Sequence, residues 1–270
     1  MSAQSFEIPR IQWVKIRDMY LTDWPKYSIT FSLIDHALKN NQNDIKLYCY
    51  CEDLSDGSFV YVNRSYGIIH CNTFSEDLQK LKNILNRIED LGLQFIIITS
   101  KSLLPIAEHV SALTNLKYEQ PTDILFHMDK TKALEIEIPK HKDVILKPLT
   151  LESVEVVNNY WPHSYPGSLE YINNLISTDF SMGAFDKITG ELMAWILRYP
   201  TGCFGMLQVK KEHLRKGLGK LVTLAITKKL AELGLDSTAT TIHDNLISRK
   251  LFNSIGFTEQ FEVFLFEWTI

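Results

Sequence analysis

The C-terminal half of the chain consists of short apolar segments whose hydrophobic period alternates between about two residues and about 3.6 residues. Runs of alternating or continuous apolar residues predict strands at 182–185, 192–197, 204–209, 237–242 and 261–268. Apolar residues at helical spacing predict helices at 151–159, at 168–175, from 218 to Gly234, and from a cap at Asp244 or Asn245 to Gly256. This order of strands and helices predicts an α/β domain.

The N-terminal half repeats the same order of elements without obvious sequence identity. Its pattern predicts helices at 28–39, at 106–113 and from 78 to 88 with a stop at Gly92, and strands at 45–51, 59–62, 66–71, 95–99 and 124–128. Charged residues and Pro139 interrupt the pattern between the halves, although 134–138 could pair as an edge strand. We therefore expect an N-terminal lobe at 1–130, a linker at 131–142 and a C-terminal domain at 143–270.

Composition and charge exclude several classes of protein. Of the 270 residues 45% are apolar, and 28 Lys and Arg against 32 Asp and Glu give a formal net charge of −4, so the chain has no overall basic field for nucleic acid. No apolar run approaches the roughly 20 residues that span a bilayer. Residues 1–17 have neither an apolar signal core nor the basic pattern of a transit peptide. We expect a cytoplasmic protein whose partners include neither nucleic acid nor a membrane.

The four cysteines do not follow a metal-binding pattern. Cys49 and Cys51 share one face of a predicted strand, but no His or Cys nearby completes a ligand set, and Cys71 and Cys203 lie apart. We expect reduced thiols and no bound metal. A redox or metal role for the Cys49 and Cys51 pair is the less favoured alternative.

A glycine-containing turn joins the strand at 204–209 to the helix that starts near residue 218. Gly217 and Gly219 allow a ligand to approach the main chain closely, and the start of the helix presents free N–H groups and the positive end of the helix dipole. The charge around the turn is positive, from Lys210, Lys211, Arg215, Lys216 and Lys220. These features predict a site for an anion with several phosphates, and a solvated basic helix start is the alternative.

The segment from Glu212 to Phe257 resembles the GNAT superfamily of acyl-CoA N-acyltransferases. The superfamily loop has the form Gln/Arg-x-x-Gly-x-Gly/Ala, here with Leu214 in the first position, and Asn245, Ser248 and Gly256-Phe257 match its second signature. The resemblance implies the α/β (α+β) class, with two GNAT-like lobes that are each a mixed twisted sheet with flanking helices. It implies that only the C-terminal lobe has a complete acyl-CoA site, and that acetyl-CoA or a longer acyl-CoA is the co-substrate, without a metal.

The residues that this resemblance assigns to coenzyme binding come from three segments. They are Leu207, Gln208 and Val209 in the strand, Leu214, Arg215, Lys216, Gly217, Leu218, Gly219 and Lys220 in the loop, and Asn245, Ser248 and Phe252 in the second signature. The strand before the loop is expected to diverge from the next strand and to offer main-chain groups to the pantetheine arm. A backbone N–H beside Gln208 or Val209 is the expected donor to the tetrahedral oxyanion.

A narrower resemblance is to the glycine N-acyltransferase family. It rests on the length of a two-lobe chain, on Asn-Asn-Tyr-Trp at 158–161 and on Glu212 five residues before Gly217. It implies acyl transfer to the amino group of glycine or a similar small-molecule amine or amino acid, and a mitochondrial location as the alternative. Two other functions remain open: a general acetyltransferase acting on a peptide amine or polyamine, and a non-catalytic acyl-CoA-binding module.

Glu212 is the residue that we expect to act as the catalytic base, because an ammonium group must lose a proton before it attacks a thioester. His213 and His243 are competing bases, and Glu212 could instead only stabilise the helix dipole. Tyr160, Trp161 and Trp195 are the expected residues of the acceptor or acyl pocket, with a place in the ordinary core as the alternative. Phe252 stands where many superfamily members carry a tyrosine acid.

Overall fold

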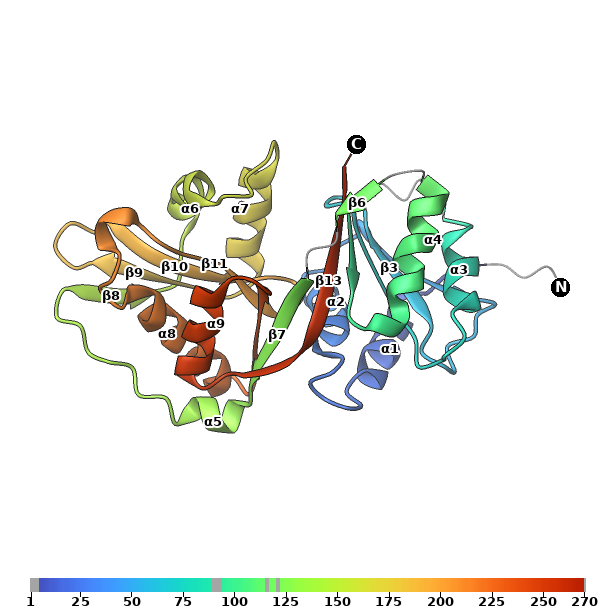
Figure 1. Ribbon diagram of the computed structural model, residues 1–270, viewed down its shortest axis with the longest axis horizontal. Coiled ribbons are helices and arrows are strands. Elements are labelled where there is room, and N and C mark those ends of the chain that lie inside the picture. The colour runs from blue at the N-terminus through green and yellow to red at the C-terminus, as the bar shows by residue number, and fades with distance from the viewer. Residues whose placement is uncertain (1–4, 89–93, 115–116, 120–121, 270) are drawn as a thin grey trace. The chain divides into compact units, whose positions relative to one another are not determined.

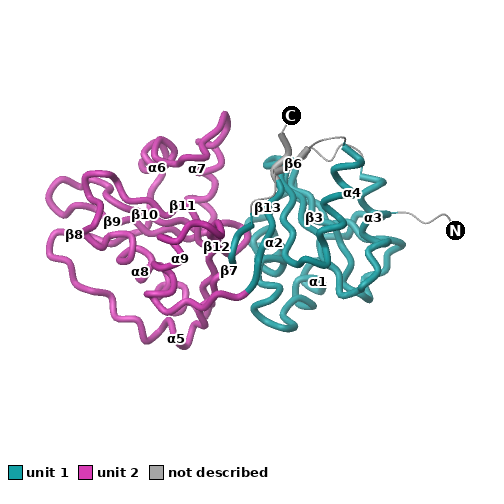
Figure 2. The backbone as a smooth tube through the Cα atoms, in the orientation of Figure 1, with its two compact units in different colours: residues 1–124, 261–270 teal, residues 125–260 magenta. Residues whose placement is uncertain are grey.

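The computed structural model describes residues 5–88, 94–114, 117–119 and 122–269. It divides into two compact units, which we call unit 1 (Met1–Ile124 with Phe261–Ile270) and unit 2 (Leu125–Gln260) (Figure 2). The units thus differ from the domains expected above, because the last strand is counted with unit 1 and residues 125–142 with unit 2. Domain boundaries at 130 and 142 stay a prediction.

Unit 1 is a mixed sheet with the neighbour order β1-β2-β3-β4-β5-β13. Its strands are β1 (Ser5–Glu7), β2 (Ile45–Tyr50), β3 (Phe59–Asn63), β4 (Ile68–Asn72), β5 (Phe95–Ile98) and β13 (Thr258–Thr269), with β6 (Lys117–Glu119) paired to β13. Among the pairs that these strands form within the described residues, only β4 and β5 run parallel. Its helices are η1 (Arg10–Gln12), α1 (Trp13–Met19), α2 (Ser28–Lys39), α3 (Gln79–Leu85), η2 (Lys101–Leu103) and α4 (Leu104–Thr114).

The alternation of side chains along β4 explains how helices cover both faces of this sheet. Ile69 and Cys71 pack into a buried cluster with α3 and α4. His70 points the other way and forms a hydrogen bond with Thr30 of α2. Strand β4, whose last four residues are all buried, therefore lies between two layers of helices.

Unit 2 has the neighbour order β7-β12-β11-β10-β9-β8, in which β8 to β11 pair antiparallel and β11 and β12 pair parallel. Its strands are β7 (Thr122–Met128), β8 (Val144–Lys147), β9 (Ser181–Asp186), β10 (Leu192–Arg198), β11 (Cys203–Val209) and β12 (Ser237–Ile242). Its helices are α5 (Lys130–Leu134), η3 (Leu151–Ser153), α6 (Val154–Tyr160), α7 (Ser168–Thr178), η4 (Lys211–His213), α8 (Leu218–Glu232) and α9 (Leu246–Ile255).

The core of unit 2 has one layer of helices on each side of the sheet (Figure 1). Val157 of α6 and Ile172 of α7 pack with Trp195 and Met206 in one buried cluster. The long helix α8 packs against β9, β10 and β11 on the other side. The prediction of two lobes, each a mixed twisted sheet with flanking helices, is confirmed.

The region between the predicted lobes differs from the expectation. No strand forms at 134–138, so the edge strand proposed there is wrong. Asp129 accepts a hydrogen bond from the backbone N–H of Thr131 and caps the short helix α5 instead. The edge strand of unit 2 is β8, which the pattern did not predict, as it did not predict β1, α1 or β6. Gly92, the expected helix stop, lies outside the described residues.

The two units share a short motif that the pattern of elements did not reveal. A Trp-Pro pair stands between two consecutive α-helices of each unit, at Trp24-Pro25 between α1 and α2 and at Trp161-Pro162 between α6 and α7. Each tryptophan contacts an aromatic ring of the helix that follows, Phe31 in unit 1 and Tyr171 in unit 2. This shared detail supports an internal repeat.

Within the described residues no helix combines the length and the apolar character needed to cross a membrane.

A buried histidine should make the stability of unit 1 depend on pH. His70 Nδ1 donates to the carbonyl of Ile97 at 2.9 Å, Nε2 lies 2.8 Å from Thr30 Oγ1, and burial lowers the pKa of His70 to about 4. In the unfolded chain the imidazole of His70 binds a proton below about pH 6.5, whereas in the folded chain it stays neutral until about pH 4. Stability is therefore lost as the pH falls through this window, by at most about 3 kcal/mol.

Urea denaturation at several pH values would check this. His70→Gln should lower stability at neutral pH but flatten the loss between about pH 6.5 and 4, because a glutamine does not titrate. His163→Gln, a change at an exposed histidine, is the control and should keep the wild-type slope. An unchanged slope in His70→Gln would contradict the prediction.

Candidate functional site

Strand β11 leaves its parallel neighbour β12 after only two paired residues in the described chain, Cys203 with Thr238 and Phe204 with Ala239. The cause is a bulge. Between the pairs Trp195–Gln208 and Leu197–Gly205, β11 contains one residue more than β10, and Met206 adopts a left-handed φ of 48°. The bulge rotates the rest of β11, so the pairing with β12 stops there.

The end of β11 therefore has an open main-chain edge. The N–H of Lys210, the next residue, donates to the carbonyl of Met193 in β10 at 2.9 Å. Because successive residues of a strand direct their main-chain groups to opposite edges, Val209 and Leu207 direct theirs away from β10 and towards the side of β12. The predicted divergence of the two strands is thus present in the structure.

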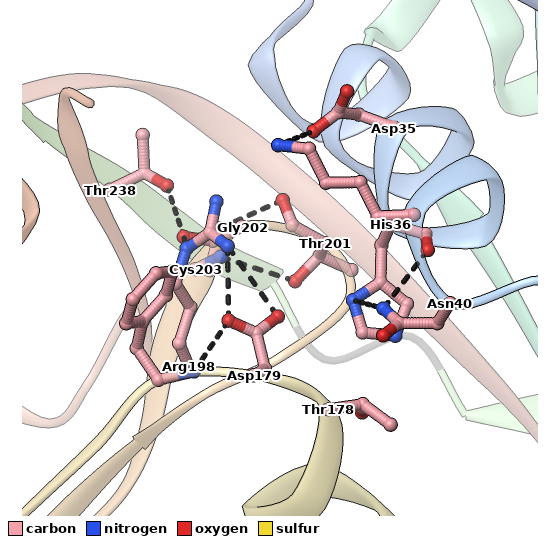
Figure 3. Close-up of polar contacts among 12 residues, drawn as sticks. Asp35, His36, Asn40, Thr178, Asp179, Arg198, Thr201, Gly202, Cys203 and Thr238 are labelled. Atoms are coloured by element: carbon pink, nitrogen blue, oxygen red, sulfur yellow. Dashed lines mark hydrogen bonds and ion pairs between the residues drawn. The ribbon is translucent and has the colours of Figure 1, made fainter. Parts of the chain in front are cut away.

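The start of β11 is firmly anchored, which fixes the point where the strands part (Figure 3). The carbonyl of Gly202 accepts hydrogen bonds from Thr238 Oγ1 at 2.9 Å and from Arg198 Nε at 3.1 Å. Arg198 Nη1 also lies 3.1 Å from Oδ1 of Asp179, whose side chain is almost fully buried. An ion pair with hydrogen bonds on both partners holds the β10–β11 turn in place.

The loop that follows β11 presents backbone donors. Leu214 is extended, Arg215 and Gly217 have left-handed φ values of 62° and 75°, and α8 begins at Leu218. The backbone N–H groups of residues 215–220 donate to no acceptor in the part of the chain that the structure describes. Alternating left-handed residues before a long helix make an anion-binding concavity, to which the helix dipole adds.

The two glycines of the loop act differently. A Cβ on Gly217 would meet no atom within 4 Å, so this position requires glycine for its φ angle. A Cβ on Gly219 would lie 3.4 Å from Val209 Cγ2. The first turn of α8 therefore lies directly against the open end of β11.

The five cations around the loop do not have equal freedom. Lys210 Nζ binds Glu191 Oε1 at 2.8 Å, Lys216 Nζ lies 3.2 Å from His213 Nδ1, and Lys220 Nζ lies 3.4 Å from the carbonyl of Ser254 at the end of α9. The side chains of Lys211 and Arg215 are exposed and have no hydrogen bond or ion pair with any described residue. These last two are the cations that an incoming anion finds unengaged.

The second signature lies at α9, where its residues divide between the helix start and the core. Asn245 caps the helix, because its Oδ1 accepts a hydrogen bond from the N–H of Ser248 at 3.1 Å. Phe252 is buried and packs against Phe126 and Phe257, each with ring centroids 5.4 Å apart. The structure thus brings Asn245 and Ser248 together at the end of β12 and places Phe252 in an aromatic cluster.

Exposed apolar side chains that the pattern did not single out border the same region. Leu214 precedes α8, Ile242 ends β12, and Leu246 and Ile247 begin α9; all four are exposed, Ile247 at 84%. Single exposed apolar residues are common, but four at neighbouring strand ends and helix starts favour a surface that a partly apolar ligand covers.

The three candidate bases have different surroundings. Glu212 lies in η4, is exposed, and its carboxylate has no partner among the described residues. Both ring nitrogens of His213 are engaged, Nδ1 by Lys216 and Nε2 by Glu191 Oε2 at 3.5 Å. His243 Nδ1 lies 3.0 Å from Asp244 Oδ1, and Nδ1 donates in this contact because a carboxylate oxygen can only accept.

The three expected acceptor residues lie on one side of the sheet, where Trp161 packs against the buried cluster that contains Trp195. Tyr160 and Trp195 meet edge to face with ring centroids 5.6 Å apart, and Lys210 Nζ lies 5.9 Å above the Tyr160 ring. Trp161 also packs with Tyr165 and Tyr171. Trp195 is fully buried, and its indole N–H has no hydrogen-bond partner among the described residues.

Within the described residues no group of three or more His, Cys, Asp or Glu side chains could hold a metal ion.

Comparison with known proteins identifies the fold. The FR47-like protein family matches residues 181–265. A Drosophila protein solved by structural genomics is similar with a TM-score of 0.84 and 18% identity, covering 97% of this chain and 98% of that one. A tandem GNAT protein from the clavulanic acid biosynthesis pathway has a TM-score of 0.62 and 13% identity, covering 100% and 98%.

A putative acetyltransferase from Pyrococcus horikoshii has a TM-score of 0.60 and 10% identity, and covers 98% of this chain and 89% of that one. At such identities the likeness shows the fold. The chain therefore has a tandem GNAT fold, with an FR47-like region that runs from β9 into β13.

Arg215 offers a test of the anion site, because its charge can be removed without a loss of backbone stability. Arg215→Gly removes an unengaged cation and relieves a left-handed residue, so stability should stay within about 1 kcal/mol of wild type. The dissociation constant for CoA, which carries a pyrophosphate, should rise several-fold, and the difference should shrink at high salt. Isothermal titration at two salt concentrations measures both effects.

Lys229→Ala is the matched control, since it removes a lysine from the opposite end of α8. It should leave CoA binding unchanged. Equal affinity of Arg215→Gly and wild type would exclude Arg215 from the site.

Proposed function

We propose that unit 2 transfers an acyl group from acyl-CoA to a primary amine. The observation that carries the proposal is the open edge of β11, which ends directly at a loop with free backbone N–H groups and unengaged cations. An extended ligand with amide groups and a terminal phosphate cluster matches this combination. The GNAT fold of the chain supports the same reaction class.

Each part of the coenzyme finds a suitable set of residues in this proposal. The pantetheine amides pair with the open main chain at Leu207 and Val209, beside Gln208. The pyrophosphate is held by the backbone of the loop from Leu214 through Lys216, Gly217, Leu218 and Gly219 to Lys220, and by the charge of Lys211 and Arg215. Asn245 and Ser248 lie at the start of α9, and the exposed apolar residues beside them shield the carbon chain of the coenzyme.

The reaction is direct attack by the amine. Glu212 accepts a proton from the ammonium group, directly or through one water, and the free amine forms a bond to the thioester carbon. The developing oxyanion needs a donor, and a backbone N–H of the open edge beside Gln208 that the pantetheine amides leave free is the candidate. The C–S bond then breaks, CoA leaves as a thiolate, and the second proton of the attacking nitrogen passes to water to give the neutral amide. The thiolate needs little help from an acid because its thiol has a pKa of about 8.5.

The acceptor in this proposal is glycine or a similar small amine. That choice rests on the resemblance of Asn-Asn-Tyr-Trp at 158–161 and of Glu212 to the glycine N-acyltransferase family. Tyr160 and Trp195 contact each other beside the bulge of β11, where the acyl group would emerge. A general acetyltransferase acting on a peptide amine or polyamine would use the same coenzyme site.

A cytoplasmic or mitochondrial location stays a prediction.

A second candidate is an acyl-CoA-binding module without turnover. The observations that favour it are the burial of Phe252, which leaves no hydroxyl at that position, and the complete burial of Trp195. The two candidates differ in one measurement, which is amine-dependent release of CoA thiol. Purified protein incubated with a panel of acyl-CoAs and amines distinguishes them.

Glu212→Gln tests the base directly. If Glu212 accepts the proton, kcat/KM should fall by about 100-fold and the pH optimum should rise, because the amine must then lose its proton to water. CoA affinity and Tm should not change, since the wild-type carboxylate has no partner to lose among the described residues.

His243→Gln is the parallel variant for the competing base. A large loss there with normal activity in Glu212→Gln would reject our assignment in favour of the His243 and Asp244 pair. Binding of CoA by the wild type without thiol release for any amine would favour the binding module.

A further inference from the structure

A single carboxylate, Glu191, contacts both ends of the short turn that carries Glu212. Its Oε1 lies 2.8 Å from Lys210 Nζ, just before η4, and its Oε2 lies 3.5 Å from His213 Nε2, at the end of η4. Within η4 the N–H of His213 also bonds the carbonyl of Lys210. The turn is thus held from its outer side by one residue of the neighbouring hairpin.

The backbone of Glu191 has little freedom. Its carbonyl accepts a hydrogen bond from the N–H of Asp186 at 2.8 Å, and its own N–H donates to Thr189 Oγ1 at 3.2 Å. Asp186 in turn accepts from the N–H groups of Ile188 and Thr189. These bonds close the turn between β9 and β10, so the carboxylate of Glu191 extends from a rigid support.

From Glu191 a chain of contacts runs in two directions. Lys210 extends to the ring of Tyr160 at 5.9 Å, and Tyr160 meets Trp195 edge to face at 5.6 Å. In the other direction, His213 Nδ1 lies 3.2 Å from Lys216 in the anion-binding loop. A lysine ammonium can only donate, so Nδ1 accepts, and the ring proton must sit on Nε2, facing Glu191.

This arrangement depends on the negative charge of Glu191. Lys210 and His213 side chains are largely covered, at 14% and 15% exposure, while Glu191 reaches them from a more exposed position. The ammonium group of Lys210 lowers the pKa of the Glu191 carboxyl, so it is ionised at neutral pH. A neutral side chain of the same shape would keep the space and lose the charge-assisted bond to Lys210.

We propose that Glu191 is a positioning residue for acyl transfer, which fixes the turn bearing Glu212 and joins the coenzyme loop to the Tyr160–Trp195 pair. The inference rests on the proposed function. It predicts that loss of the Glu191 charge impairs the use of both substrates, although Glu191 itself touches neither. A carboxylate that served only the hairpin would affect stability and leave both kinetic constants unchanged.

The test is a double-mutant cycle on Glu191 and Lys210. Glu191→Gln should lower kcat about 10-fold and raise KM for both acyl-CoA and the amine several-fold, and Lys210→Met should do the same. Because both variants break one contact, the double variant should be no worse than the more impaired single variant. Tm of each variant is recorded beside the kinetics, and Glu232→Gln, at the far end of α8, is the matched control with wild-type constants.

Each outcome bears on one proposal. Absence of thiol release by the wild type would reject the proposed function. Wild-type turnover with unchanged kcat and KM in Glu191→Gln would reject the positioning role alone, and so would losses that multiply in the double variant. Should Glu191→Gln fail to fold, His213→Asn breaks the other contact of Glu191, and unchanged KM for both substrates in that variant would also overturn the proposal.

Discussion

The candidate site depends on one constraint, which is that β11 cannot pair with β12 along its whole length. The β10–β11 turn is fixed by Arg198, Asp179 and the carbonyl of Gly202, and the bulge at Met206 rotates everything after it. Parallel strands that part inside a domain leave main-chain groups unpaired, which is costly unless water or a ligand satisfies them. The open edge is therefore stabilised by the packing of the unit and is available to a ligand that can extend the sheet.

Unit 1 shows what happens when the same order of elements lacks this constraint. There β4 and β5 pair at three successive positions, and His70 adds a side-chain bond to the carbonyl of Ile97. The loop before α3 contains no glycine, and three of its N–H groups donate to side chains of the same loop. Thr73, Ser75 and Asp77 accept from the N–H groups of Ser75, Asp77 and Gln79 in turn. A phosphate would meet there a loop whose N–H groups are in part already bonded, beside strands that stay paired.

The sequence predicted the elements of both units well, because their hydrophobic periods are strong and glycines or capping residues mark their ends. Helix α2 and strand β12 begin and end at the predicted residues, and Asn245 caps α9 as expected. Residues 134–138 were assigned wrongly because an apolar alternation cannot reveal that Asp129 caps a helix just before it.

The candidate site was predictable only where main-chain chemistry follows from residue type. Gly217 and Gly219 predicted the loop, and the basic residues around them predicted its positive charge. Nothing in the sequence shows that Lys210 and Lys220 are engaged while Lys211 and Arg215 are not, because the contacts of Lys210 and Lys220 join residues that are distant along the chain. The role inferred for Glu191 is of the same kind, since it depends on a hairpin that lies beside η4 only in the folded unit.

The strained backbone positions of unit 2 lie at the candidate coenzyme site. Among the described residues of unit 2, the non-glycine residues with left-handed φ values are Met206 and Arg215. Such residues cost about 1 kcal/mol or more each and persist where the surrounding structure imposes them. One makes the bulge that opens β11 and the other turns the loop so that its N–H groups converge. Relaxation of Met206 would let β11 pair further with β12, and relaxation of Arg215 would turn the loop N–H groups away from one another. The fold therefore retains strain at the two positions that shape the candidate coenzyme site.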